Sequence, residues 1–262
     1  MKFGYGIVAA TERGRVRKGE YDSFMEDYLR HLIDPQAAKL RESTCSSLAD
    51  ALAATGAVLW AFGLAEQPRR AIATAIQIGG ETARGAVTLL RDNNRYGAAA
   101  LVRQIVEIEY LLFLFAQDTD EPLKWASCDL KAVREQYQPA RMRERSGGQF
   151  RIEEYSSHCQ VGGHPRYAGA YLLPEHIRPG PLSDEAVFAA GWVDLAQHLA
   201  RVWRWIGQIL SKYDLLEVGL ANSSLARAYE SITVWLREDF CAPLLNESEA
   251  LLLKQAASTP PA

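Results

Sequence analysis

Apolar residues recur at alternating steps of four and three between residues 188 and 209. The positions are Phe188, Trp192, Leu195, Leu199, Val202, Ile206 and Ile209. Side chains at this spacing share one face of an α-helix, so the pattern predicts a long amphipathic helix. Its apolar face would either pack inside the chain or form a seam with a second chain, and three heptads are too few to separate these alternatives.

The helical period recurs along most of the chain. We expect helices over residues 21–33, 35–62, 68–90, 98–118, 121–138, 149–161, 185–213, 223–240 and 246–256. Proline is tolerated at the first helical position, which supports helix starts at Pro35 and Pro68. No segment alternates convincingly with period two, so the sequence predicts an all-α, up-and-down helical bundle without a sheet.

One long stretch, residues 162–184, is rich in glycine and proline and interrupts the helical pattern. It either separates a larger helical domain from a C-terminal helical hairpin or forms a long loop inside one bundle. The C-terminal helices are strongly amphipathic and need a surface to pack on, so we favour a single domain over residues 1–262. Residues 1–20 are expected to form an N-terminal extension, and residues 257–262 a disordered tail.

Composition places the chain among ordinary globular proteins, because 262 residues with 48% hydrophobic and 23% charged residues can bury a substantial core. The formal net charge of −3 gives no overall attraction to nucleic acid or to an anionic membrane, so a basic site would have to be local. The four cysteines form no C-x-x-C pair, which fits a reducing compartment. We find no export signal and no apolar run long enough to span a bilayer, so the sequence predicts a cytoplasmic protein.

Familiar enzyme motifs for phosphate loops, zinc proteases, serine hydrolases and dinucleotide binding are absent, so the candidate chemistry comes from the segment "RIEEYSSH". A helix over residues 149–161 would bring Arg151, Tyr155 and His158 to one face, beside Glu154. An imidazole can exchange a proton with a ribose hydroxyl, and a guanidinium can hold the charge that develops on a phosphate. The spacing predicts a phosphodiester-cleaving site that needs no metal.

The same spacing resembles the R-x(4-6)-H motif of the HEPN superfamily, because six residues separate Arg151 from His158. The run "VTLLRDNNRYGAAALVRQIVEIEYLLFLFAQDTDEPLKWA", followed by "EEYSSHCQVGGHP", is similar to uncharacterised bacterial HEPN-like proteins of the abortive-infection type. In those proteins a helix with R-x-x-x-E precedes a Tyr/Ser/His segment. The resemblance covers residues 70–170, which is under half of the chain.

The resemblance implies a four- to six-helix bundle that is often dimeric. Members act as metal-independent ribonucleases in toxin or phage-defence systems, or have lost catalysis and serve as binding modules. Carried over to this chain, Arg151 would be the phosphate ligand and His158 the general acid or base, with Tyr155 and Glu154 in support. Ile152 departs from the pattern, because active members usually have a polar residue at that position.

A purely structural interpretation accounts for the same residues. Arg151 would then pair with Glu154 or Glu107, while His158 would pack near the end of its helix, where the dipole favours a cation. Arg103 and Glu107 are four residues apart and would fix helix register, unless Glu107 orients His158 across the core. We assign these two residues, together with His164, a structural or supporting role.

Two further groups of residues could bind a ligand. The first is a group of basic residues, Lys131, Arg134, Arg141, Arg143 and Arg145. It would either attract an RNA backbone or form a solvated helix face. The second has zinc-ligand types in a spacing that matches no common structural site, and comprises His158, Cys159, His164 and His176. We therefore expect neither a metal nor another cofactor.

The sequence as a whole predicts a HEPN-like, RNA-binding, homodimeric protein, with metal-independent endoribonuclease activity of a toxin or phage-defence type. A neighbouring antitoxin or another protein would be its partner. The alternative is a non-catalytic scaffold module that binds a partner protein through its apolar helical stripes, or a small ligand in a pocket lined by aromatic residues of the C-terminal helices.

Overall fold

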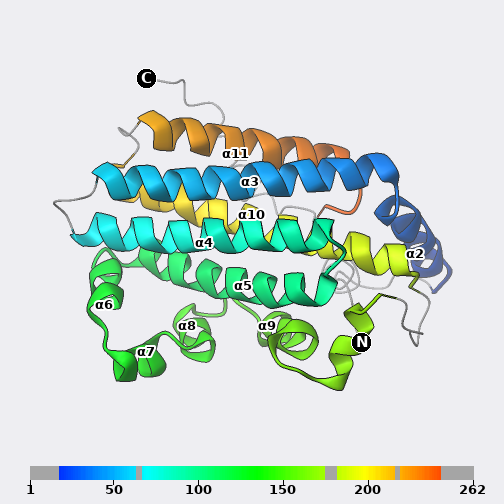
Figure 1. Ribbon diagram of the computed structural model, residues 1–262, viewed down its shortest axis with the longest axis horizontal. Coiled ribbons are helices and arrows are strands. Elements are labelled where there is room, and N and C mark those ends of the chain that lie inside the picture. The colour runs from blue at the N-terminus through cyan, green and yellow to red at the C-terminus, as the bar shows by residue number, and fades with distance from the viewer. Residues whose placement is uncertain (1–17, 63–66, 175–181, 216–218, 243–262) are drawn as a thin grey trace.

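The structure, a computed structural model, describes residues 18–62, 67–174, 182–215 and 219–242. Over these ranges the chain forms helices and no strand, which confirms the all-α bundle. The long helices lie side by side along the molecule (Figure 1) and are α3 (Pro35–Phe62), α4 (Gln67–Arg91), α5 (Arg95–Gln117), α10 (Asp184–Lys212) and α11 (Gly219–Glu238). Helix α3 packs against α4, α10 and α11, and α5 packs against α4 and α10.

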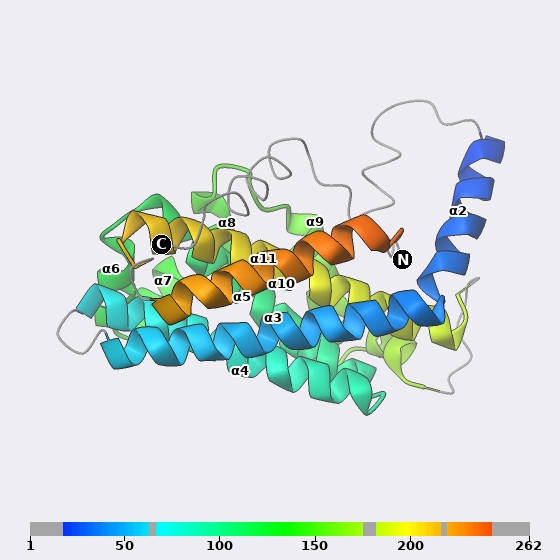
Figure 2. The same ribbon diagram turned by 90° about the horizontal axis from the view of Figure 1, so that it is seen from above.

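The shorter helices cover one end and one side of this bundle. Helix α2 (Lys18–Leu32) stands at one end at a steep angle to α3, as Figure 2 shows. The others follow α5 and lie on the same side of it (Figure 1): α6 (Glu121–Ser127), α7 (Leu130–Gln136), α8 (Pro139–Arg145) and α9 (Ile152–His158). A π-helical turn over Cys159–Gly163 and a 3-10 helix over Tyr167–Leu172 come next.

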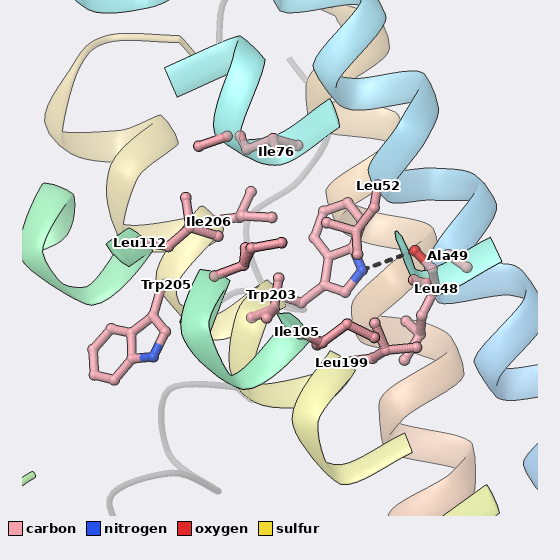
Figure 3. Close-up of a cluster of buried hydrophobic side chains, with 14 of the residues drawn as sticks. Leu48, Ala49, Leu52, Ile76, Ile105, Leu112, Leu199, Trp203, Trp205 and Ile206 are labelled. Carbon is pink, nitrogen blue, oxygen red and sulfur yellow. Dashed lines mark hydrogen bonds between the residues drawn. The ribbon is translucent and has the colours of Figure 1, made fainter. Parts of the chain in front are cut away.

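The core forms where the apolar faces of α3, α4, α5 and α10 meet (Figure 3). Six of the seven residues in the α10 stripe are buried, so this face packs inside the chain and is not a seam between two chains. At the centre of the core the buried Trp203 donates a hydrogen bond from its indole nitrogen to the backbone oxygen of Leu48, at 3.2 Å. This bond satisfies the one polar atom of the side chain in an otherwise apolar core.

Glycines allow α3 and α4 to approach closely. A Cβ atom on Gly80 would lie 2.4 Å from the backbone nitrogen of Ala53, and one on Gly56 would lie 2.6 Å from the backbone nitrogen of Gln77. No side chain fits at these distances, so the glycines inside the helical pattern mark helix contact and do not interrupt the helices.

Several predicted helix boundaries are wrong by three or four residues, since α5 and α11 begin at Arg95 and Gly219 and not at residues 98 and 223. The expected helix over residues 149–161 begins only at Ile152, because Arg151 is extended (φ −89°, ψ 142°) and follows Gly147 and Gly148, which have left-handed φ angles of 62° and 92°. The expected helix over residues 121–138 is two helices, because Cys128 is extended (φ −66°, ψ 132°) between α6 and α7.

Several predictions fall on residues that the structure does not describe. The helix expected over residues 246–256 and the tail over residues 257–262 lie outside the described residues, as do residues 1–17 of the expected N-terminal extension and residues 175–181 of the expected long loop. Helix α2 begins at Lys18, inside the expected extension.

A buried ion pair ties α3 to the end of α11. The guanidinium of Arg41 binds the carboxylate of Asp239 through two hydrogen bonds of 2.6 and 2.7 Å, and both side chains are 0% exposed. Asp239 also accepts a hydrogen bond of 2.9 Å from the indole nitrogen of Trp235. The sequence analysis did not single out these residues, because their pairing joins positions 198 residues apart.

One described helix, α3, is long and apolar enough to cross a membrane by length and composition, and 50% of its most apolar window is buried inside the protein. A core helix of a soluble protein has the same properties. A cytoplasmic location remains a prediction.

Candidate functional site

The structure places Arg151 at the surface and buries His158. Arg151 is exposed and stands before α9 in an extended conformation, so the helical spacing that would place it over His158 does not apply. His158 is the last residue of α9, and its side chain is turned into the bundle with 6% of the residue exposed. The predicted pairing of an arginine and a histidine in an open cleft is therefore not the geometry of this segment.

His158 instead faces a second histidine, His198 of α10. Their Nε2 atoms are 3.1 Å apart, and the two rings are nearly perpendicular, at 71°. On its other side the Nδ1 atom of His198 lies 2.9 Å from a carboxylate oxygen of Glu109 on α5. His198 and Glu109 are 1% and 2% exposed, so the row of three side chains runs into the core where α5, α9 and α10 meet.

Two more carboxylates flank the histidines. Asp194 lies one turn before His198 on α10, with oxygens 3.7 Å from Nε2 of His198 and 3.6 Å from Nδ1 of His158. Glu154 of α9 has an oxygen 3.8 Å from Nε2 of His198 and also binds Arg201. Asp194 is 40% exposed, so the cluster meets solvent beside it. We call these five residues, His158, His198, Glu109, Asp194 and Glu154, the histidine centre.

Burial and charge act in opposite directions on the groups of the histidine centre. Burial lowers the pKa of His158, although the charge of Asp194 opposes the shift. Burial also acts to lower the pKa of His198, but the hydrogen bond with Glu109 and the charge of Asp194 outweigh it, so the pKa is raised. Burial likewise acts to raise the pKa of Glu154, and the charges of Arg201 and His198 reverse this effect. The pKa values of the two histidines are thus shifted in opposite directions.

Tyr155 belongs to a separate cluster beside the histidine centre. Its hydroxyl donates a hydrogen bond of 2.8 Å to Glu107, which also binds the guanidinium of Arg103 at 2.9 Å. Burial and this hydrogen bond raise the pKa of Tyr155. Glu107 therefore binds Tyr155 and does not have the predicted contact with His158. The carboxylate that contacts a histidine is Glu109, two residues further along α5. The structural role predicted for Arg103 and Glu107 fits this contact between α5 and α9.

The predicted basic residues are spread over α7 and α8, and most have acidic partners. Lys131 lies 3.9 Å from Glu135, Arg141 lies 2.9 Å from Glu144, and Arg145 lies 2.6 Å from the buried Glu121. Among the described residues, Arg134 and Arg143 are the two of the five without an ion pair.

The remaining predicted residues lie apart from the histidine centre. His164 is exposed, and its backbone oxygen accepts a hydrogen bond of 3.1 Å from the hydroxyl of Tyr96. The expected absence of a metal site rested on the spacing of His158, Cys159, His164 and His176. His176 lies outside the described residues, and the group that could hold a metal ion combines His158 with Asp194 and His198.

Comparison of the chain with protein-family models, with curated proteins and with solved structures found no match. The HEPN-like resemblance therefore stays a prediction, and the geometry of the histidine centre carries the functional argument.

Sequence reasoning found His158 and Glu154 but missed Glu109, Asp194 and His198. Two signals were present in the sequence. Glu109 is an acidic residue within the nearly apolar half of α5, and His198 lies in α10 next to its apolar stripe, four residues after Asp194. A buried polar residue needs a partner, so each of these positions indicates a polar contact in the core.

Proposed function

We propose that the histidine centre is the active site of a HEPN-like helical-bundle protein that binds and cleaves RNA. One observation carries the proposal, namely the row formed by Glu109, His198 and His158, in which the Nε2 atoms of two nearly perpendicular imidazoles are 3.1 Å apart. Glu109 accepts from Nδ1 of His198 and so fixes the orientation of that ring, as carboxylates do beside catalytic and metal-bound histidines. In this proposal His198 joins His158 in proton transfer, and Arg201 has the phosphate-binding role that the sequence analysis predicted for Arg151.

One guanidinium accompanies the carboxylates on the solvent-facing side of the histidine centre. Asp194 is the most exposed member, and Arg201, 31% exposed and bound to Glu154, lies on the same helix as Asp194 and His198. A guanidinium beside the histidines can hold a phosphate oxygen and can stabilise the charge that develops on it. In this proposal cleavage takes place at the solvent-facing side of the centre, near Asp194 and Arg201.

Basic residues near the centre support RNA as the substrate. Helix α8 carries Arg143 and packs against α5, the helix that carries Glu109 and Tyr110. Burial and the charges of Glu154 and Glu109 raise the pKa of Tyr110. The charges of Arg143 and Arg201 act in the opposite direction. Both guanidiniums therefore lie within electrostatic reach of Tyr110, the residue next to Glu109, and in this proposal they attract a phosphate backbone.

A second candidate function is a non-catalytic module that binds a partner protein. The burial of His158 favours this function, because a side chain that is only 6% exposed gives a substrate little access. Solvent meets the centre beside Asp194, which is 40% exposed. In that case the row of Glu109, His198 and His158 would hold α5, α9 and α10 together and would have no chemical role.

Cleavage of a fluorescent single-stranded RNA by the purified protein, with and without added divalent metal, tests the proposal. His198→Asn keeps an N–H that can donate to Glu109 but removes Nε2, and we expect it to reduce cleavage by about 10²–10⁴-fold. Arg151→Ala should reduce cleavage much less. Circular dichroism checks that both variants are folded.

If Arg151→Ala reduces cleavage more than His198→Asn does, the active site includes Arg151 and the proposal is contradicted. If the wild-type protein cleaves no RNA under either condition, the non-catalytic module is the better account.

A further inference from the structure

We propose that the histidine centre binds one zinc ion through Nε2 of His158, Nε2 of His198 and a carboxylate oxygen of Asp194. The ligand atoms of these residues all lie within 4.8 Å of one another. This inference stands apart from RNA cleavage, since a bound metal can be measured directly. It goes beyond the proposed function, in which the two imidazoles transfer protons, and does not depend on it.

The spacing of the ligand atoms fits a small tetrahedral ion. Zinc binds nitrogen and oxygen at about 2.0–2.1 Å, so neighbouring ligand atoms of a tetrahedral site are about 3.3 Å apart. The two Nε2 atoms are 3.1 Å apart, and an oxygen of Asp194 lies 3.7 Å from Nε2 of His198. The Asp194 oxygen nearest to His158 lies 3.6 Å from Nδ1 of that ring, and the three ligand atoms are within 4.8 Å of one another. The side chain of Asp194 would therefore have to turn toward Nε2 of His158 to close the site around an ion.

The surroundings prepare His198 to be a ligand. When Nδ1–H of His198 donates a hydrogen bond to Glu109, the neutral ring keeps its lone pair on Nε2, which faces His158. A carboxylate on the far nitrogen is the usual partner of a metal-bound histidine, and it increases the basicity of the ligand. Asp194 and His198 are four residues apart on α10, so both reach the ion from one face of one helix.

Charge also favours a cation at this position. Three carboxylates, Glu109, Asp194 and Glu154, surround the two imidazoles, and Arg201 binds Glu154. Two imidazole nitrogens at hydrogen-bond distance need a hydrogen or a metal ion between them, because two lone pairs repel. A divalent ion would bind both lone pairs and offset the acidic side chains.

The ligand set is that of a catalytic metal site. Structural zinc sites have four protein ligands, whereas catalytic sites have three and leave the fourth position to water or substrate. Here the third ligand, Asp194, lies at the solvent edge, so the fourth position would open there. Glu154, 3.8 Å from Nε2 of His198, is near enough to accept a hydrogen bond from a bound water.

Titration of the chelator-treated full-length protein with zinc chloride, followed by calorimetry, tests the site. We expect one zinc ion per chain for the wild-type protein. We expect Glu109→Gln, which alters only the outer partner, to weaken binding by about 10–100-fold, and His198→Asn and Asp194→Asn to weaken it further. Cobalt(II) should bind in the same place and give the visible absorption of a tetrahedral complex.

Two variants serve as matched controls. His31→Asn removes an exposed histidine of α2, and Glu153→Gln removes the exposed carboxylate next to Glu154, so both should bind zinc as tightly as the wild type. Asp194→Asn alters a half-exposed residue, and it keeps the test decisive if a buried-histidine variant fails to fold.

The outcomes separate this inference from the proposed function. No stoichiometric zinc binding, or equal binding by wild type and Asp194→Asn, overturns the zinc site, and RNA cleavage that persists in chelator would then leave the proposed function in place. Zinc binding that depends on His198 and Asp194 without any RNA cleavage supports the site and overturns the nuclease. Preference for iron(II) or manganese(II) over zinc contradicts the choice of zinc.

Discussion

Asp239→Ala is expected to lower the free energy of unfolding by about 3–5 kcal/mol, because it leaves a buried charge without its counter-ion. The guanidinium of Arg41 is 0% exposed and would keep hydrogen bonds only to the backbone oxygens of residues 31 and 32. Trp235 would also lose the acceptor of its indole N–H. The shift in the midpoint of urea unfolding, followed by circular dichroism, measures the loss.

The neighbouring residue gives the control for this prediction. Glu238 is 50% exposed and pairs with Arg237 at the surface, so Glu238→Ala should change stability by less than about 1 kcal/mol. A double variant, Arg41→Met with Asp239→Leu, should recover much of the stability, because apolar side chains of similar size can replace a buried pair. If Asp239→Ala and Glu238→Ala have similar effects, the pair does not tie α3 to α11 as described.

Zinc is expected to stabilise the wild-type protein strongly, because an ion that binds only the folded chain shifts the unfolding equilibrium. At a free zinc concentration 100 times the dissociation constant, the gain is about 2.7 kcal/mol. Thermal unfolding with and without zinc would show it as a rise in Tm that a chelator reverses. The rise should be lost in His198→Asn and kept in His31→Asn.

A rise of equal size in wild type and His198→Asn would mean that zinc binds elsewhere on the folded chain. Zinc that lowers Tm in both proteins would mean preferential binding to the unfolded chain, and either result contradicts the stabilising role of the histidine centre.

The fold could be predicted from the sequence because helical periodicity is a local property. The apolar stripe predicted a helix over residues 185–213, and α10 spans Asp184–Lys212. The start of α9 could not be placed in this way. Its sequence tolerates a helix from residue 149, but the left-handed backbone at Gly147 and Gly148 and the extended Arg151 delay the helix to Ile152.

Only part of the candidate site could be predicted from the sequence, for a different reason. His158 and Glu154 stand in one short polar segment, so local spacing drew attention to them. Their partners His198 and Glu109 come from other helices, and the contacts span 40 and 89 residues of sequence. One sequence contains no signal for which distant helices meet, although an isolated acidic or histidine residue in a buried helix indicates that a partner exists.

The central claim is that His158, His198 and Asp194 form a metal site, and anomalous X-ray scattering at the zinc absorption edge tests it most directly. For crystals of the zinc-loaded protein, we predict one strong peak between the two imidazoles, about 2.0–2.1 Å from each Nε2 atom, with a carboxylate oxygen of Asp194 as the third ligand. A map with no peak there, in which the two Nε2 atoms remain hydrogen-bonded to each other and zinc occupies surface positions only, would contradict the account.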